Sequence, residues 1–284
     1  MSPHLITGVG PIGSAAITAT AVAILLVGCA PPTAGSNAEP AAAVVGAESP
    51  TSTTSDCPNP YGGTCLGALE AGEYQTSTFE PQITYRVPEG WMNYEDLPGN
   101  FWLFLQEDEE FQATPRGGSY LGIFTGIHAA AIDCSETWQE GVGTNPAQLV
   151  AWYQSVPGLI VSEPVKVSVG GLRGLQIDVS LEEGNDTCNF GGYTGIPLIT
   201  GDGVSEVHHV VLDDMDVRLV FLRHRNSNVT LEITNVREQR SAEEFRGLVQ
   251  PIVDSLAFAT PSVVSCQFRG SPGLAVATNV GARC

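Results

Sequence analysis

Lysine is almost missing from this sequence. Lys166 is the only one, and arginine supplies the rest of the 12 basic residues, against 31 Asp and Glu. The formal net charge is −19. A surface this acidic repels nucleic-acid phosphates and anionic lipid headgroups. We therefore expect no nucleic-acid partner.

Recognisable catalytic motifs are also absent from the sequence. It contains no Gly-x-Ser-x-Gly, His-Glu-x-x-His or Walker pattern, and no Gly-x-Gly-x-x-Gly after a strand. No Cys-x-x-Cys pair occurs, and no His lies three or four residues from a Cys, so we expect no cofactor and no metal bound by the thiols. A triad dispersed along the chain would leave no motif, so an enzyme is not excluded. Its candidate members are His128 and Asp133 with Ser119 or Ser135.

The first 28 residues have the features of a bacterial lipoprotein signal peptide. No Lys or Arg precedes residue 57, and residues 15–27 form an uncharged, mostly apolar run that is too short to span a bilayer. The run ends in Leu26-Val27-Gly28-Cys29-Ala30, which resembles the lipobox. This resemblance implies cleavage after Gly28 and a diacylglyceryl group, with acyl chains such as palmitate, on Cys29. The alternative is an uncleaved membrane anchor.

The expected location follows from this leader. Two or more acyl chains hold a protein stably on a membrane. Residues 29–56 are rich in Pro, Ala, Ser, Thr and Gly, a composition typical of a flexible linker. We therefore expect a lipid-anchored protein on the extracytoplasmic face of the cell membrane, with a single domain over residues 57–284.

Six cysteines remain when Cys29 is set aside. An even number in an oxidising compartment indicates disulfide bonds, and six cysteines allow fifteen connectivities. We favour pairing between sequence neighbours, so that the two outer bonds staple the ends of the domain. The expected pairs are Cys57–Cys65, Cys134–Cys188 and Cys266–Cys284.

The residue patterns of the domain predict a strand-rich fold. Apolar runs at 83–87, 101–105 and 120–127 are typical of β-strands. Alternating segments at 165–169 and 172–181 predict a hairpin with one buried and one wet face. A second meander is expected over 207–212, 217–224 and 229–234. In its last strand we expect Val229, Leu231 and Ile233 to point inward and Thr230, Glu232 and Thr234 to point outward.

Two helices are expected to cover the sheet. The first begins at the N-cap Asn145 with Pro146 and ends at Pro157-Gly158. The second begins with the capping-box spacing of Ser241 and Glu244, and Pro251 is expected to kink it near Gly247. The expected apolar face of the first helix is Leu149, Trp152, Tyr153 and Val156. That of the second is Phe245, Leu248, Ile252 and Leu256, with Val249 as a further candidate. The fold class is therefore α+β, an antiparallel sheet with two helices packed on it.

Three segments resemble a known family. They are Tyr85-Arg86-Val87-Pro88-Glu89-Gly90-Trp91, the turn Pro157-Gly158-Leu159 with residues 167–174 (Val-Ser-Val-Gly-Gly-Leu-Arg-Gly), and the closing helix with Asp254-Ser255-Leu256. In this order they resemble the PsbP-like domains of secreted bacterial lipoproteins, the actinobacterial LpqN type among them. The resemblance covers about residues 74–258. It implies binding or assembly rather than catalysis.

Two surface features could bind a partner. Trp91, Tyr94, Phe101 and Trp102 surround a Pro-Gly turn, and aromatic side chains there could anchor an envelope protein or a glycan, or simply cap a sheet end. The stretch 208–216, with His208, His209, Asp213, Asp214 and Asp216, could hold a metal together with His224, although the spacing matches no known scheme. We favour a non-catalytic binding or assembly lipoprotein; an envelope hydrolase and a metal-binding module are the alternatives.

Overall fold

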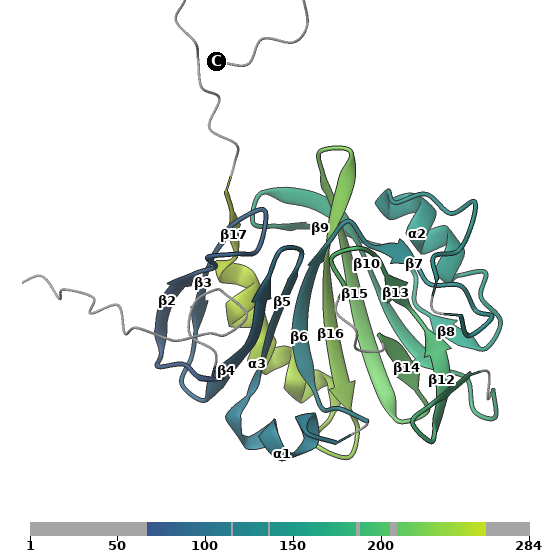
Figure 1. The fold of residues 1–284 in the computed structure, drawn as a ribbon, viewed down its shortest axis with the longest axis horizontal. Helices are drawn as coiled ribbons and strands as arrows, with labels where there is room; N and C mark the ends of the chain where they lie inside the picture. The colour runs from purple at the N-terminus through teal and green to yellow at the C-terminus, as the bar shows by residue number, and fades with distance from the viewer. Residues whose placement is uncertain (1–66, 115, 136, 186–187, 205–208, 260–284) are drawn as a thin grey trace, which may run out of the picture. The chain divides into compact units, whose positions relative to one another are not determined.

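The computed structural model describes residues 67–114, 116–135, 137–185, 188–204 and 209–259, and Figure 1 shows their arrangement. Several sequence-based predictions lie outside these residues. They are the signal peptide, the lipid attachment at Cys29, the linker, and the pairs Cys57–Cys65 and Cys266–Cys284. No helix in the described ranges is long and apolar enough to cross a membrane.

In the described part of the chain, nine strands form the main antiparallel sheet. Its strand order is β1-β4-β5-β6-β16-β15-β10-β8, and β9 also pairs with β10. The bounds are β1 (Gly67–Ala68), β4 (Trp91–Leu97), β5 (Asn100–Leu105), β6 (Tyr120–Thr125), β8 (Leu159–Val161), β9 (Val165–Val169), β10 (Leu172–Leu181), β15 (Met215–His224) and β16 (Ser227–Val236).

Smaller sheets and the helices lie around this sheet. The bounds of the further strands are β2 (Gly72–Gln75), β3 (Ile83–Val87) and β17 (Ala257–Phe258) in one sheet, β11 (Cys188–Phe190), β12 (Tyr193–Pro197) and β14 (Val210–Leu212) in a second, and β7 (His128–Ala129) with β13 (Ile199–Thr200) in a third. The helices are η1 (Gln106–Asp108), α1 (Glu109–Gln112), α2 (Pro146–Tyr153) and α3 (Ala242–Ser255). The expected α+β class is confirmed.

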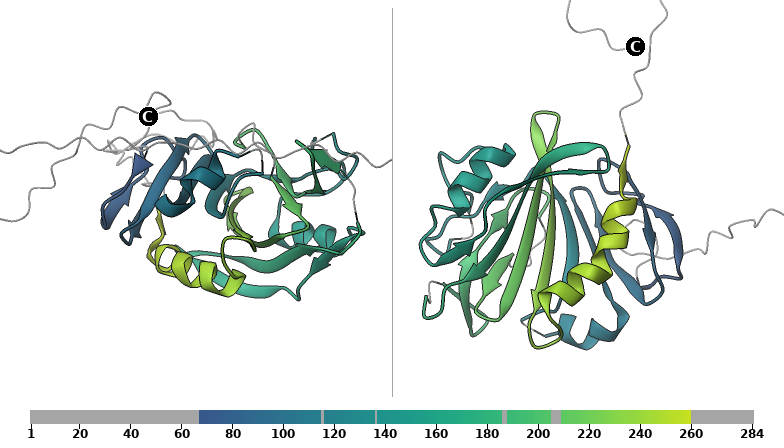
Figure 2. Two further views of the ribbon diagram at one scale, coloured as in Figure 1. Left: turned by 90° about the horizontal axis from the view of Figure 1, so that it is seen from below. Right: turned by 180° about the vertical axis from the view of Figure 1, so that it is seen from behind.

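The two longer helices cover opposite faces of the main sheet. Helix α3 lies across one face, as the rear view in Figure 2 shows, and Phe245, Val249 and Ile252 pack there against β5, β6 and β16. Helix α2 and the β11-β12-β14 sheet cover the other face, where Leu149 and Tyr153 join the core. The main sheet therefore separates two apolar cores, called here the α3 face and the α2 face.

The helix ends follow the capping signals in the sequence. The side chain of Asn145 accepts hydrogen bonds from the backbone N–H groups of Ala147 and Gln148, and that of Ser241 accepts from Glu244. Helix α3 continues through Pro251. The prediction for Leu248 was wrong, because its side chain is 39% exposed whereas its neighbour Val249 is fully buried.

The prediction that one face of the last strand of the second meander is exposed to solvent was also wrong. Thr230, Glu232 and Thr234 of β16 are as buried as Val229 and Leu231. The reason is the central place of β16 between β6 and β15, with α3 over one face and the α2-face core over the other. Strands buried on both faces lose the simple alternation of apolar and polar positions.

Candidate functional site

Glu232 and His209 form a buried pair on the α2 face of the main sheet. Glu232 lies in β16 opposite Gly122 of β6 and Leu219 of β15. Its Oε2 atom is 2.8 Å from Nδ1 of His209, and neither side chain is exposed. Nε2 of His209 has no hydrogen-bond partner in the described ranges. A buried carboxylate needs a polar partner, and the contact between Oε2 and Nδ1 provides one. Each residue therefore holds the other in place.

Aromatic rings enclose the pair. The ring of His209 meets those of Phe124 and Trp102 edge to face, at centroid distances of 4.6 and 5.7 Å. Gly122 makes this possible, because a Cβ atom there would lie 2.6 Å from the ring of Phe124. The glycine opposite Glu232 thus leaves the space that the Phe124 ring occupies.

Two hydroxyl groups lie between the pair and open space. Thr234 donates a hydrogen bond to Oε1 of Glu232 at 3.4 Å, and the hydroxyl of Tyr120 is 3.5 Å from Nδ1 of His209. Burial raises the pKa of Tyr120 well above its ordinary value, and the negative charge of Glu232 raises that pKa further. Tyr120 is therefore a neutral phenol that can donate or accept a hydrogen bond.

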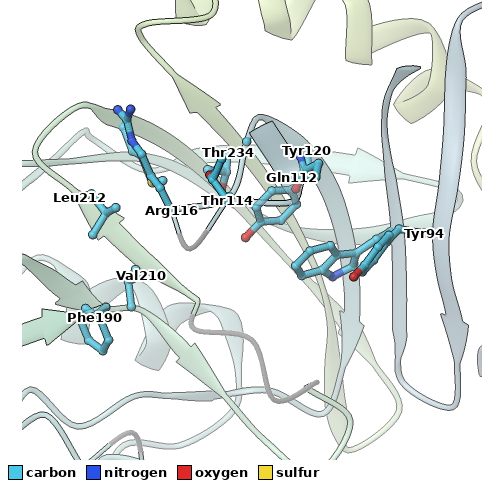
Figure 3. A pocket seen from close by; sticks show the side chains of 13 residues that line it. Tyr94, Gln112, Thr114, Arg116, Tyr120, Phe190, Val210, Leu212 and Thr234 are labelled. Carbon is cyan, nitrogen blue, oxygen red and sulfur yellow. The ribbon is translucent and has the colours of Figure 1, made fainter. Parts of the chain in front are cut away.

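A cavity of about 220 Å³ opens beside these hydroxyls, between the main sheet and the β11-β12-β14 sheet. Figure 3 shows the Tyr120 hydroxyl pointing into it, with Phe190, Val210 and Leu212 on the opposite wall. The ring of Trp102 stacks on that of Tyr120 at 4.5 Å. Thr114, Gln112 and Thr234 add polar groups. Apolar walls with a few polar groups are typical of small-molecule sites.

The mouth of the cavity carries aromatic rings and one arginine. Tyr94 is 48% exposed, and its ring lies 5.8 Å from that of Trp102. Arg116 lies over the ring of Tyr193 at 6.0 Å, donates to Glu238 at 2.8 Å and pairs with Asp214. The arginine thereby connects the segment after α1, the β14–β15 turn and β12 at the mouth.

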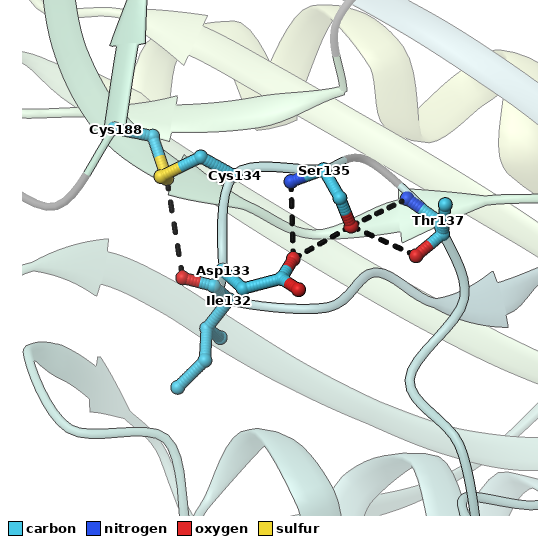
Figure 4. The surroundings of a disulfide bond; sticks show 6 residues. All are labelled: Ile132, Asp133, Cys134, Ser135, Thr137 and Cys188. Atoms are coloured by element: carbon cyan, nitrogen blue, oxygen red, sulfur yellow. Dashed lines mark hydrogen bonds between the residues drawn. A yellow bond between two sulfur atoms is a disulfide. The ribbon is translucent and has the colours of Figure 1, made fainter.

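A disulfide bond fixes the far wall of the cavity. Cys134 and Cys188 are bonded, with Cα atoms 5.5 Å apart, which confirms this pair of the predicted three. Figure 4 shows the bond beside the loop of Asp133, Ser135 and Thr137. Since Cys188 begins β11, which also carries the wall residue Phe190, the bond restrains that wall.

The four aromatic residues proposed from the sequence do not form one cluster. Trp91 is 1% exposed and Phe101 is fully buried, both on the α3 face, where Trp91 packs against Phe245. Tyr94 and Trp102 lie on the other side, at the cavity. Only these last two are placed to touch a ligand there, and binding by them stays a prediction.

The members of the suggested triad lie apart. Ser135 donates to Asp133 at 2.6 Å, but the ring of His128 packs on Trp138 at 5.0 Å. Ser119 donates to Gln239 at 2.8 Å. The described ranges thus bring together only Ser135 and Asp133 of this set.

The acidic turn proposed for a metal is occupied by arginines. Asp216 accepts from Arg237 at 2.9 Å, and Asp214 pairs with Arg116. His208 lies outside the described residues, and His209 points to Glu232. Within the described ranges, no group of three His, Cys, Asp or Glu side chains gathers to hold a metal.

Sequence reasoning missed several residues of this site, namely Glu232, Tyr120, Thr234 and Arg116, and it interpreted His209 only as a metal ligand. One signal in the sequence pointed to Glu232. It is a charged residue at the centre of the apolar meander, between Leu231 and Ile233. A carboxylate in such a place must be paired or solvated, but the sequence does not show which partner it has.

No protein-family model matches the chain, and no curated protein matches it. Two solved structures are similar to it at 12% sequence identity. One is a crystal structure from Bacteroides thetaiotaomicron, with a TM-score of 0.31, covering 63% of this chain and 45% of that one, so the chain spans less than half of that protein. The other is the solution structure of cyanobacterial PsbP (CyanoP) from Synechocystis, with a TM-score of 0.33, covering 71% of this chain and 100% of that one. Similarities of this size carry no argument about the family or the function of this chain.

Proposed function

We propose that the protein is a lipoprotein of the cell envelope that binds a small amphipathic ligand without catalysis. Lipid on Cys29 tethers it to the extracytoplasmic face of the membrane, and the ligand occupies the cavity beside Tyr120. The observation that carries the proposal is this cavity, with apolar walls, two hydroxyls at its inner end and a wall restrained by a disulfide. Such a combination suits a ligand with an apolar body and a polar end.

The tether has a direct test. Replacing Cys29 by alanine removes the acyl chains, whose buried methylenes each contribute about 0.8 kcal/mol to membrane binding. We expect the variant to move from the membrane pellet to the supernatant when cells of a bacterial host are fractionated. Cys57→Ala is the matched control and should stay in the pellet. Equal distribution of Cys29→Ala and the unchanged chain would refute the lipid anchor.

The cavity is tested by blocking its mouth. Thr114 lines the cavity but is exposed, so Thr114→Trp should fill the entrance at little cost in stability. We expect native mass spectrometry of the protein from its own kind of host to show a bound mass that Thr114→Trp loses. Leu248→Trp, on the exposed side of α3, should keep that mass. A bound mass that survives in Thr114→Trp would place the ligand elsewhere.

A further inference from the structure

The carboxylate of Glu232 lies behind the inner end of the cavity. Tyr120 and Thr234 line it, and Glu232 is fully buried directly behind Thr234. The negative charge of Glu232 also raises the pKa of Tyr120, whose side chain lines the cavity. Oε2 of this carboxylate contacts His209, while Oε1 is turned to the Thr234 hydroxyl at the cavity wall.

The mouth of the cavity offers no spare positive charge. Arg116 is the one basic side chain among the described residues that line the cavity. It already pairs with two carboxylates, Glu238 and Asp214. Figure 3 also shows its guanidinium turned away from Tyr120. An anionic ligand would therefore have to enter a negative field and compete with two carboxylates for one guanidinium.

We propose that the cavity selects its ligand by charge, taking small amphipathic amines in the protonated form and rejecting carboxylates and phosphates with the same apolar body. This rests on the proposed function, because it assumes that the cavity is the ligand site. The hydroxyl oxygens of Tyr120 and Thr234 accept hydrogen bonds from an ammonium group. The rings of Tyr120 and Tyr94 attract a cation, while Phe190, Val210 and Leu212 contact the apolar body.

The size of the cavity limits the apolar body to one ring or a short chain. Its volume of about 220 Å³ lies below the range of about 300–1,000 Å³ that drug-sized ligands occupy. Three probes share one phenyl body and differ at the polar end: 2-phenylethylamine, 2-phenylethanol and 3-phenylpropanoate. We would titrate each into the full chain held in zwitterionic nanodiscs at neutral pH, with empty nanodiscs as the blank.

The expected order of affinity is amine, alcohol, carboxylate. A charged group in a partly buried site makes a Coulomb interaction of a few kcal/mol, so the Kd values of amine and carboxylate should differ by at least about tenfold. Glu232→Gln should reduce this ratio to below about threefold, while the Kd of 2-phenylethanol stays unchanged. Circular dichroism would show that this variant is folded.

A second variant is independent of the buried pair. The side chain of Glu238 is 67% exposed, so Glu238→Gln should leave the fold intact while it frees Arg116 from one carboxylate. We expect the affinity for 3-phenylpropanoate to rise about threefold. Glu243 is exposed on α3, at the other face of the sheet. Glu243→Gln removes the same charge there and should leave the affinity for 3-phenylpropanoate unchanged.

The outcomes distinguish two claims. One is that the cavity selects its ligand by charge, called here the charge rule, and the other is that the cavity is the ligand site. Equal or tighter binding of the carboxylate by the unchanged chain would overturn the charge rule but leave the cavity as the binding site. Binding of none of the three probes would overturn the charge rule as well. The proposed function falls with it only if Thr114→Trp also fails to remove the co-purified mass.

Discussion

Replacing both Cys134 and Cys188 by serine is expected to lower the free energy of unfolding by about 4 kcal/mol. The bond closes a loop with a sequence separation of 54, and removing it returns the entropy of that loop to the unfolded chain. For a domain of this size, the loss corresponds to a fall in Tm of roughly 8–16 °C. Differential scanning calorimetry of the two chains would measure it.

The same substitution should also weaken ligand binding. Cys188 begins β11, and without the bond the wall that carries Phe190 loses its covalent link to the loop of Cys134. Ser135→Ala changes the same loop without touching the disulfide and serves as the control. A Tm within about 2 °C of the unchanged protein would show that packing alone holds this region.

Replacing His209 by phenylalanine is expected to destabilise the domain by about 3–5 kcal/mol. The substitution leaves the Glu232 carboxylate fully buried, with the Thr234 hydroxyl at 3.4 Å among its remaining hydrogen-bond donors. A buried carboxylate without its polar partner is costly, and phenylalanine is close in shape to the lost ring, so the cost reports on the lost partner rather than on a cavity. Urea unfolding followed by circular dichroism would measure it.

The matched control removes both members of the pair. In His209→Phe with Glu232→Met no charge is left buried, and much of the lost stability should return. If the double variant is as unstable as the sum of the two single ones, the residues do not act as a pair, and the geometry of 2.8 Å between Oε2 and Nδ1 has no energetic consequence.

Local patterns in the sequence were enough to predict the two longer helices and the three longest strands, β10, β15 and β16. Asn145 and Ser241 mark the helix starts, since capping needs only residues close in sequence. The hairpin of β9 and β10 follows from the alternation of apolar and polar residues. Such patterns involve residues that are close together in the sequence. The helix ends and hairpins that they predict are formed by residues equally close together.

The candidate site could not be found in this way, because its parts come from distant segments. In the sequence, His209 is 23 positions from Glu232 and 89 positions from Tyr120. Alternation in β16 was interpreted as one wet face, whereas that face is covered by elements far away in the sequence. A polar residue at such a position is satisfied by a partner that no local pattern reveals.

The prediction that the four aromatic residues form one binding surface could partly have been avoided. Phe101 and Trp102 are neighbours in one strand, and successive side chains of a strand point to opposite faces. The two therefore could not share a binding surface, and the structure places Phe101 under α3 and Trp102 at the cavity. What the sequence could not tell is which of the two faces is hollow.

The pairing of β6 with β16 also bears on how the chain is made. Asn228 holds Ile127 through two hydrogen bonds across 101 positions, and β16 lies between strands from the two halves of the described chain. While the ribosome is still extending the chain, β5 and β6 lack this neighbour, and the sheet cannot be completed. We therefore expect a nascent chain of this topology to stay incompletely folded until its last strands have been synthesised.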